Sequence, residues 1–252
     1  VYVGKKHTVK VDDFYIGRYK VTNKDFQVFL QEKNIQLDYE LSAIRQKLFT
    51  AANAYPELPA QMHWQEANDY CNWLAEGTGL AFSLPTEAQW EYVATEGGKD
   101  ADELNTIWRW YPNPVPVPQP EERWNYAEKL GSGLGYDQAL PGDSYPPNTL
   151  GVYDLLANGA EWLSDWYDPE YYDYSPEDNP QGPDEPRVKE LYDYMGNPFG
   201  ERVYNMKSTR GGIFSPRSIW EMVVIREGFP LEFPPRLLNS TVRCVVNQSE
   251  LD

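Results

Sequence analysis

The sequence predicts a loop-rich α+β domain with short helices and small antiparallel sheets. Its 252 residues include 19 Tyr, 9 Trp and 9 Phe beside 21 Pro and 18 Gly. This composition is typical of a globule whose irregular segments are held by large rings, rather than of a helical bundle. In addition, short helical patterns with clear caps alternate with short apolar runs of strand type. A chain of this length buries a core as one large domain or as two small ones.

The N-terminal part of the chain predicts a strand followed by a capped helix. Between residues 8 and 19, apolar and polar residues alternate as in a half-buried strand or hairpin. Thr22 then has the position of an N-cap, with Asp25 three residues later. The apolar residues that follow form one helical face: Phe26, Phe29 and Leu30.

Two more helices are predicted before residue 100. The first covers residues 64–74, where apolar residues repeat at helical spacing, and a Gly-Thr-Gly sequence ends it. The second begins after Thr86, which forms a capping box with Gln89, and it continues to about Ala94. We expect Trp90 of this helix to face the core.

The rest of the chain has less regular periodicity. A weaker pattern predicts a short helix over residues 41–48. The segments 112–147 and 168–202 are rich in Pro and exceed the usual length of a connection, which indicates functional loops or insertions. Short apolar runs at residues 222–225 and 242–246 predict closing strands.

The formal net charge of −17 restricts the partners of this protein. Binding to nucleic acid or to anionic lipid needs clustered Lys and Arg, so we expect no nucleic-acid partner. No apolar run approaches the length of a membrane span and no signal-peptide pattern is present, so we expect no membrane insertion. The acidic surface is compatible with cations or a basic partner, and equally with a role in solubility alone.

The stretch from Asn148 to Tyr167 has the clearest site chemistry. Asp154 and Glu161 bracket a turn of small residues whose backbone carbonyls are free to bind. Oxygen ligands on both sides of such a turn suit a hard cation such as calcium. The alternative is a solvated turn between two buried segments, and this spacing by itself does not decide between them.

Several segments together resemble the formylglycine-generating-enzyme (sulfatase-modifying factor) family. They occur in the family's order over nearly the whole chain, and the Leu-Pro-Thr-Glu-Ala-Gln-Trp-Glu segment that starts at Leu84 is highly specific. The matching segments are residues 14–23, 63–74, 84–92, 148–167, 210–212 and 242–244. The resemblance implies a single C-type lectin-like domain over residues 1–252, with 112–147 and 168–202 as long loops or insertions within it.

The resemblance also implies calcium sites. Asp154 and Glu161 occupy side-chain ligand positions of the family, which favours the calcium interpretation of this turn. A second family site would have its downstream carboxylate near Leu134, where this chain offers none. The implied ligands are the side chains of Asp154 and Glu161, the carbonyls of Ala157 and Gly159 and, in the second site, Asn125 and Tyr126.

The two cysteines, Cys71 and Cys244, match positions that form a disulfide in some family members. Such a bond would close a long loop and contribute about 4–5 kcal/mol in the chain-entropy model. The alternative is two buried thiols, as expected in a reducing cytosol. We therefore expect an exported or extracytoplasmic protein if the two residues are bonded, and a cytoplasmic one otherwise.

Catalysis does not carry over from the resemblance. The family oxidises a substrate cysteine with two active-site cysteines that bind copper, and soft thiolates suit Cu(I). In this chain those positions are Pro216 and Glu221, so we expect no copper and no formylglycine generation. Glu87 and Glu91 are expected to be structural carboxylates that satisfy backbone or Arg donors, rather than an acid–base pair.

Three functions remain, and the first is a non-catalytic bacterial binding module. Such a pseudoenzyme would recognise a protein or peptide partner through the former active-site face. Aromatic rings beside a cation suit a protein-binding hot spot, although the same rings could instead close the core. The residues of this face are Phe214, Arg217, Trp220, Glu221, Phe229 and Phe233.

The second and third functions use other features of the chain. An enzyme of different chemistry, as in relatives implicated in siderophore maturation or accompanying non-haem iron synthases, would use Glu221 and Glu227 near Arg226 as a carboxylate site. However, two distant histidines cannot complete a two-His, one-carboxylate iron site. An immunity-type protein would neutralise a cognate toxin through the acidic surface.

Overall fold

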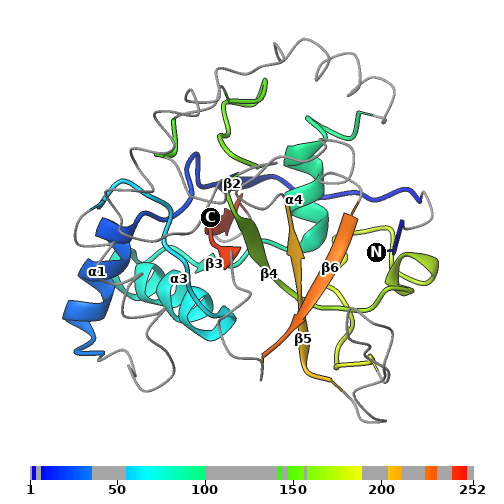
Figure 1. Cartoon of the computed structure of the whole chain (residues 1–252). Helices are drawn as coiled ribbons and strands as arrows, with labels where there is room; N and C mark the ends of the chain where they lie inside the picture. The colour runs from blue at the N-terminus through cyan, green and yellow to red at the C-terminus, as the bar shows by residue number, and fades with distance from the viewer. Residues whose placement is uncertain are drawn as a thin grey trace, which may run out of the picture.

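The computed structural model has an α+β fold, and Figure 1 shows its helices and strands. The residues that the structure describes are 2–3, 7–35, 55–99, 141–143, 147–155, 158–188, 204–211, 225–231 and 240–248. The helix predicted over residues 41–48 and the strand residues 222–224 lie outside them, as do most of the predicted long loop 112–147 and residues 189–202 of the other loop.

The larger sheet in the described residues has five strands in the order β1-β6-β5-β4-β7. Neighbouring strands are antiparallel except β4 and β7, which are parallel. This one parallel pair differs from the expected antiparallel pairing, and the long connection between β4 and β7 permits it. The strands are β1 (Tyr2–Val3), β4 (Ala160–Trp166), β5 (Met206–Arg210), β6 (Ile225–Pro230) and β7 (Ser240–Thr241).

A smaller sheet pairs a strand from the N-terminal part of the chain with one near the C-terminal end. Its order is β2-β8-β3, with β2 (Phe14–Ile16), β3 (Phe82–Ser83) and β8 (Val245–Asn247). The strand predicted over residues 8–19 is therefore reduced to its central part. The chain leaves the sheet at Gly17, whose amide still donates to the Cys244 carbonyl at 2.9 Å.

The three predicted helices form with the predicted caps. In α1 (Asn23–Glu32), the Thr22 hydroxyl accepts from the Asp25 amide at 3.2 Å, and the Asp25 carboxylate accepts from the Thr22 amide at 3.2 Å. Thr86 and Gln89 make the same reciprocal pair at the start of α4 (Glu87–Ala94). The remaining helix, α3 (Trp64–Thr78), ends at a left-handed Gly79, and a short 3₁₀ turn, η2, covers Tyr171–Asp173.

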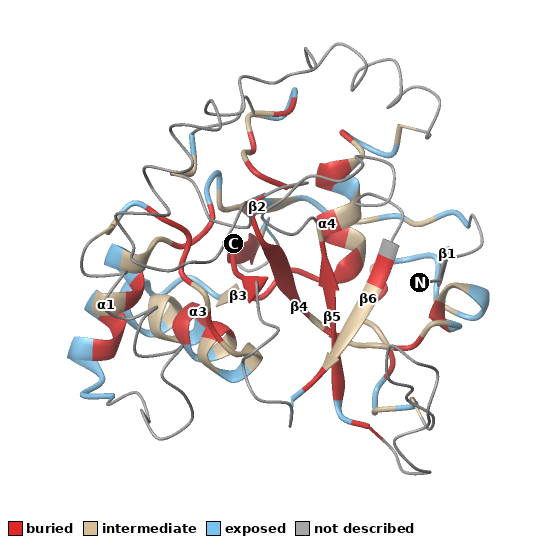
Figure 2. Ribbon diagram, in the orientation of Figure 1, coloured by how far each residue is buried: buried red, intermediate tan, exposed pale blue. Residues whose placement is uncertain are grey.

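The core lies on both sides of β4 and β5, which are buried along most of their length (Figure 2). On one side α1 packs on α3, as Figure 1 shows, and their aromatic faces include Phe26, Phe29 and Tyr70. On the other side α4 contacts β4 and β5 through the fully buried Trp90, as the sequence predicts. Charged side chains are also buried in this layer, and they form the candidate site.

Candidate cation site and interaction face

The turn before β4 reverses the chain through left-handed backbone conformations. Asp154, Asn158 and Gly159 have φ values of 58°, 61° and 99°. Asn, Asp and Gly adopt this conformation more readily than other residues do. The amide Nδ2 of Asn158 also donates to Oδ2 of Asp154 at 3.0 Å, which closes the turn. Ala157, the other predicted carbonyl ligand, lies outside the described residues.

Glu161 is fully buried on β4, and the protein itself engages both of its oxygens. Arg243 donates from Nε to Oε2 at 2.7 Å and from Nη2 to Oε1 at 2.8 Å. The indole Nε1 of Trp90 also donates to Oε2 at 3.2 Å. A bidentate pair of this kind is a strong, directional interaction, so Glu161 is held in one orientation.

A second cation, the ammonium of Lys20, lies against the same turn. Its Nζ donates to the carbonyl of Gly159, and to the carbonyl of Asn158 at 3.3 Å. It lies 3.5 Å from Oε1 of Glu161, and neither side chain has any exposed surface. We call Lys20, Asp154, Glu161 and Arg243 the Glu161 cluster.

Burial shifts the titration of two members of the Glu161 cluster. It lowers the pKa of Lys20 to about 8, although the charge of Glu161 opposes the shift. It raises the pKa of Asp154 to about 6, opposed mainly by Lys20. One oxygen of this carboxyl, Oδ1, is buried and has no hydrogen-bond partner within the described part of the chain.

These residues do not fit a calcium ion in the way that the sequence led us to expect. The unpartnered Oδ1 of Asp154 favours a cation, but the Lys20 ammonium already lies on the Gly159 carbonyl. Calcium takes six to eight oxygen ligands. The described residues contain no group of three or more His, Cys, Asp or Glu that could hold a metal. The second predicted site, at Asn125 and Tyr126, lies outside them.

A second buried charge cluster joins α4 to the large sheet. Glu87 accepts from Nε and Nη2 of Arg226 at 2.6 and 2.9 Å, and from Nη1 of Arg210 at 2.8 Å. Arg210 also donates to Glu91 at 2.8 Å, and the Tyr172 hydroxyl donates to Glu91 at 2.7 Å. These five residues are the Glu87 cluster. Glu87 and Glu91 thus satisfy arginine donors, as the sequence predicts.

Asp165 on β4 lies next to the Glu87 cluster, and its pKa is shifted in the opposite direction to that of Glu87. Its Oδ2 accepts from the backbone amide of Glu87 at 2.9 Å. Burial, and then the negative charge of Glu87, raises the pKa of Asp165 to about 7. The pKa of Glu87 is lowered to about 2, because the hydrogen bonds and charges of Arg226 and Arg210 outweigh its burial. Glu87 is therefore the stronger acid of the two, and Asp165 keeps its proton to a much higher pH.

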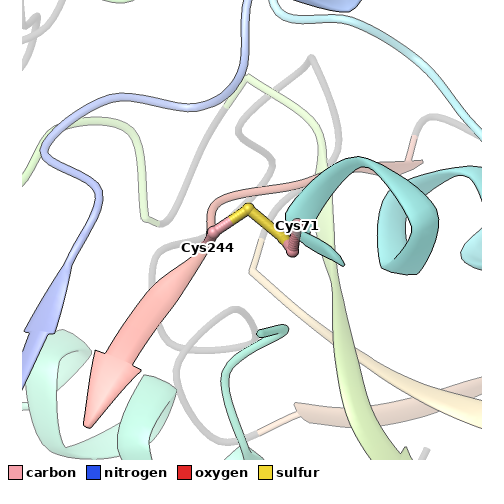
Figure 3. The surroundings of a disulfide bond; sticks show 2 residues. All are labelled: Cys71 and Cys244. Carbon is pink, nitrogen blue, oxygen red and sulfur yellow. A yellow bond between two sulfur atoms is a disulfide. The ribbon is translucent and has the colours of Figure 1, made fainter. Parts of the chain in front are cut away.

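The two cysteines form the disulfide that the resemblance implied. Figure 3 shows Cys71 on α3 joined to Cys244, which comes just before β8, with 5.7 Å between the two Cα atoms. Since the chain has only these two cysteines, none remains as a free thiol. Among the helices that the structure describes, none is both long enough and apolar enough to cross a membrane.

The predicted interaction face is described in part. Phe229 lies on β6 opposite Lys207 of β5, and its ring meets the edge of Trp162 at a centroid distance of 6.2 Å. This half-buried ring therefore helps to close the core. Phe214, Arg217, Trp220, Glu221 and Phe233 lie outside the described residues.

The alternative carboxylate site at Glu221 and Glu227 near Arg226 stays a prediction, because Glu221 lies outside the described residues. The Arg226 guanidinium is committed to Glu87 and to the carbonyls of Asp168 and Pro169. Glu227 lies on β6 opposite Thr209 of β5, and burial raises the pKa of its carboxyl.

Sequence reasoning missed the two cations of the Glu161 cluster. Lys20 is separated from Phe14 and Ile16 by an even number of positions. The alternating N-terminal pattern would therefore place its side chain on the same inward side. A lysine at the end of such a pattern is normally solvent-exposed, because burying its charge is unfavourable. Arg243 belongs to a matched segment, but nothing in the spacing assigned it to Glu161, 82 residues away.

Comparisons with known proteins agree with this architecture. The Sulfatase-modifying factor enzyme 1-like domain matches residues 4–242. The formylglycine-generating enzyme of Streptomyces coelicolor is 29% identical over 218 residues, in a match that covers 70% of this chain and 65% of that protein. The inactive C-alpha-formylglycine-generating enzyme 2 of Mus musculus is 29% identical over 203 residues, covering 66% and 62%. The chain thus spans less than two thirds of the length of these relatives.

A solved structure has the same fold at lower sequence identity. The Treponema denticola variable protein 1 aligns with a TM-score of 0.61 and 18% identity, over 98% of this chain and 89% of that one. The expected fold class is confirmed. Because the family match extends over residues 4–242 of 252, this chain belongs to the family of the Sulfatase-modifying factor enzyme 1-like domain, in which formylglycine-generating enzymes and inactive paralogues both occur.

Proposed function

We propose that this chain is a non-catalytic member of the family and acts as a binding module for a protein or peptide partner. The observation that carries the proposal is the pairing of its only two cysteines with each other. Holding Cu(I) at the family's position takes two thiolates, and the sulfurs of a disulfide do not provide them. A relative that is named inactive supports the same conclusion.

The partner surface that we propose is the former active-site face, from Phe214 to Trp220 and from Gly228 to Leu238. Its sequence combines aromatic rings with Arg217, the residue types that dominate binding hot spots. Phe229 fixes one end of this face to the core through its contact with Trp162, so the partner contacts are proposed for the other aromatic residues. An interface there would be anchored on the rigid β4–β6 strands.

The disulfide also supports an exported or extracytoplasmic location, because such bonds persist in oxidising compartments.

Calcium sites are common in this family. A structural calcium at Asp154 and Glu161 is not part of our proposal, since Lys20 lies on the same turn.

Activity and binding are tested separately. In the first experiment the purified protein is incubated with a sulfatase-type cysteine peptide, copper and oxygen, and the peptide mass is followed. We expect no conversion of the cysteine to an aldehyde. Formation of the aldehyde at a rate above that of copper alone would overturn the non-catalytic assignment.

In the second experiment a partner recovered with the wild-type protein is titrated against variants. Trp220→Ala is expected to weaken binding by about 30-fold, the change that corresponds to a hot spot of 2 kcal/mol. The matched control is Tyr15→Ala, since Tyr15 is 60% exposed and lies on β2 of the other sheet. Equal affinity of the two variants would place the interface elsewhere.

A further inference from the structure

The Lys20 ammonium occupies the position where a cation is expected. In the described part of the turn before Glu161, the Nζ of Lys20 donates to two backbone carbonyls, those of Asn158 and Gly159. The same Nζ lies 3.5 Å from Oε1 of Glu161. Backbone carbonyls and a carboxylate around one positive charge are the surroundings that a hard metal ion would also require.

Backbone hydrogen bonds on both sides of Lys20 hold it in this place. The Gly17 amide donates to Cys244 at 2.9 Å, and the Val21 amide donates to Val242 at 2.8 Å. On its other edge, the Val21 carbonyl accepts from the Ala60 amide at 2.8 Å. The segment is therefore fixed between two neighbours, and the fully buried Lys20 side chain is part of the fold.

The charges of the Glu161 cluster already balance without a metal. Lys20 and Arg243 carry two positive charges, and Asp154 and Glu161 carry two negative charges when ionised. A calcium ion would add two further positive charges in a region without solvent. The carboxylate of Glu161 can moreover accept about four hydrogen bonds. It accepts two from Arg243 and one from Trp90, and the Lys20 ammonium lies beside it.

We infer that the Lys20 ammonium replaces calcium in this chain, as a covalently attached cation that neutralises the turn before β4. The turn then needs no metal from the medium to neutralise its oxygens. Removing Lys20 while leaving its volume empty should recreate a calcium site, from the Gly159 carbonyl, Glu161 and the unpartnered Oδ1 of Asp154. This inference does not depend on the proposed function.

The first test compares thermal unfolding with calcium chloride and with EDTA. We expect the same melting temperature for the wild-type protein in both, and no binding heat on titration with calcium. Lys20→Ala should melt at a lower temperature in EDTA and regain most of the loss in calcium, by mass action of the ion on the folded state. Lys20→Met fills the space without a charge, so it should be destabilised without any recovery in calcium.

The control is Lys24→Ala, which removes an exposed lysine of α1 and should change neither the melting temperature nor the response to calcium. Stoichiometric calcium binding that stabilises the wild-type protein would overturn the inference. So would a Lys20→Ala variant that is as stable as Lys24→Ala, or one that is destabilised but gains nothing from calcium.

A second test uses only the wild-type protein, so it applies even if Lys20→Ala does not fold. It asks whether the Lys20 ammonium is held in the turn. Native protein is treated with an amine-acylating reagent and then digested, and the modified lysines are identified by mass. Lys20 should be protected in the folded state even in EDTA, whereas Lys24 should react at the rate of a free amine. Rapid acylation of Lys20 in the folded protein would show that the ammonium is not held in the turn.

Discussion

Two buried charge clusters meet at Trp90, and they differ in where their cations come from. The Trp90 indole donates to Glu161, while the Arg210 guanidinium of the Glu87 cluster lies 5.1 Å from the centre of its ring. The Glu87 cluster uses two arginines from strands of the large sheet. The Glu161 cluster uses one arginine and a lysine from a segment 141 residues earlier in the chain.

This difference shows that the sequence around a buried carboxylate does not identify the cation that pairs with it. Both clusters contain a fully buried glutamate, and a buried carboxylate needs a charged partner. Around Glu87 the partners are arginines, which bind in a fixed, bidentate geometry. Around Glu161 the turn also offers backbone carbonyls, which suit a compact cation, either a metal ion or an ammonium.

The largest expected effect comes from the disulfide, which lies beside the Glu161 cluster because Cys244 follows Arg243. Replacing Cys71 and Cys244 by Ser should lower the free energy of unfolding by about 5 kcal/mol in the chain-entropy model, given their sequence separation of 173. Urea unfolding with and without a reductant measures this loss. An unfolding midpoint of the wild-type protein that stays the same after the disulfide is reduced would contradict this prediction.

The next largest effect is expected at the centre of the Glu87 cluster. Glu87→Gln leaves the buried Arg226 and Arg210 without their main charged partner, a loss of about 3–5 kcal/mol. The control is Glu91→Gln, since the Glu91 side chain is 38% exposed and water can replace its contact, at a loss of about 1 kcal/mol. Equal losses for the two variants in urea unfolding would show that burial does not set the difference.

A pH-dependent effect separates Asp165 from Glu87. The folded-state pKa of Asp165, about 7, is above its ordinary value of 3.8, so its contribution to stability is full below pH 3.8 and is lost as the pH rises to about 7. Asp165→Asn keeps an acceptor for the Glu87 amide and should remove this loss. Glu87 acts in the opposite direction, since its stabilisation is lost as the pH falls from 4.5 towards 2.

Unfolding free energies measured across pH 2–8 for the wild-type protein and Asp165→Asn test this prediction. The difference between the two proteins should change between about pH 4 and pH 7 and stay level outside that window. A constant difference would mean that folding does not shift the pKa of Asp165.

The smallest effect is expected for an ion pair outside both clusters. Lys33 and Glu76 join the ends of α1 and α3, and their side chains are 39% and 66% exposed. Lys33→Gln should change the free energy of unfolding by less than about 1 kcal/mol, since solvent screens an exposed pair. A larger loss in urea unfolding would weaken the conclusion that burial distinguishes the two clusters from the surface.

The sequence alone determined the elements whose signals are local. The N-cap at Thr22 and the capping box at Thr86 formed as predicted, because each joins residues only three positions apart. The core position of Trp90 followed from helical spacing, and the roles of Glu87 and Glu91 followed from their places on that helix. Family resemblance, carried by short motifs, added the fold and the Cys71–Cys244 pair.

Only the tertiary structure decided which charges meet. Lys20, Arg243 and Glu161 come from three segments far apart in the sequence, and they meet because β2, β4 and β8 bring their ends together. An alternating pattern places Lys20 on the inner face, but it contains no information about the carbonyls that Lys20 will find there. The selection of an ammonium in place of a metal depends on this long-range packing, which no local spacing encodes.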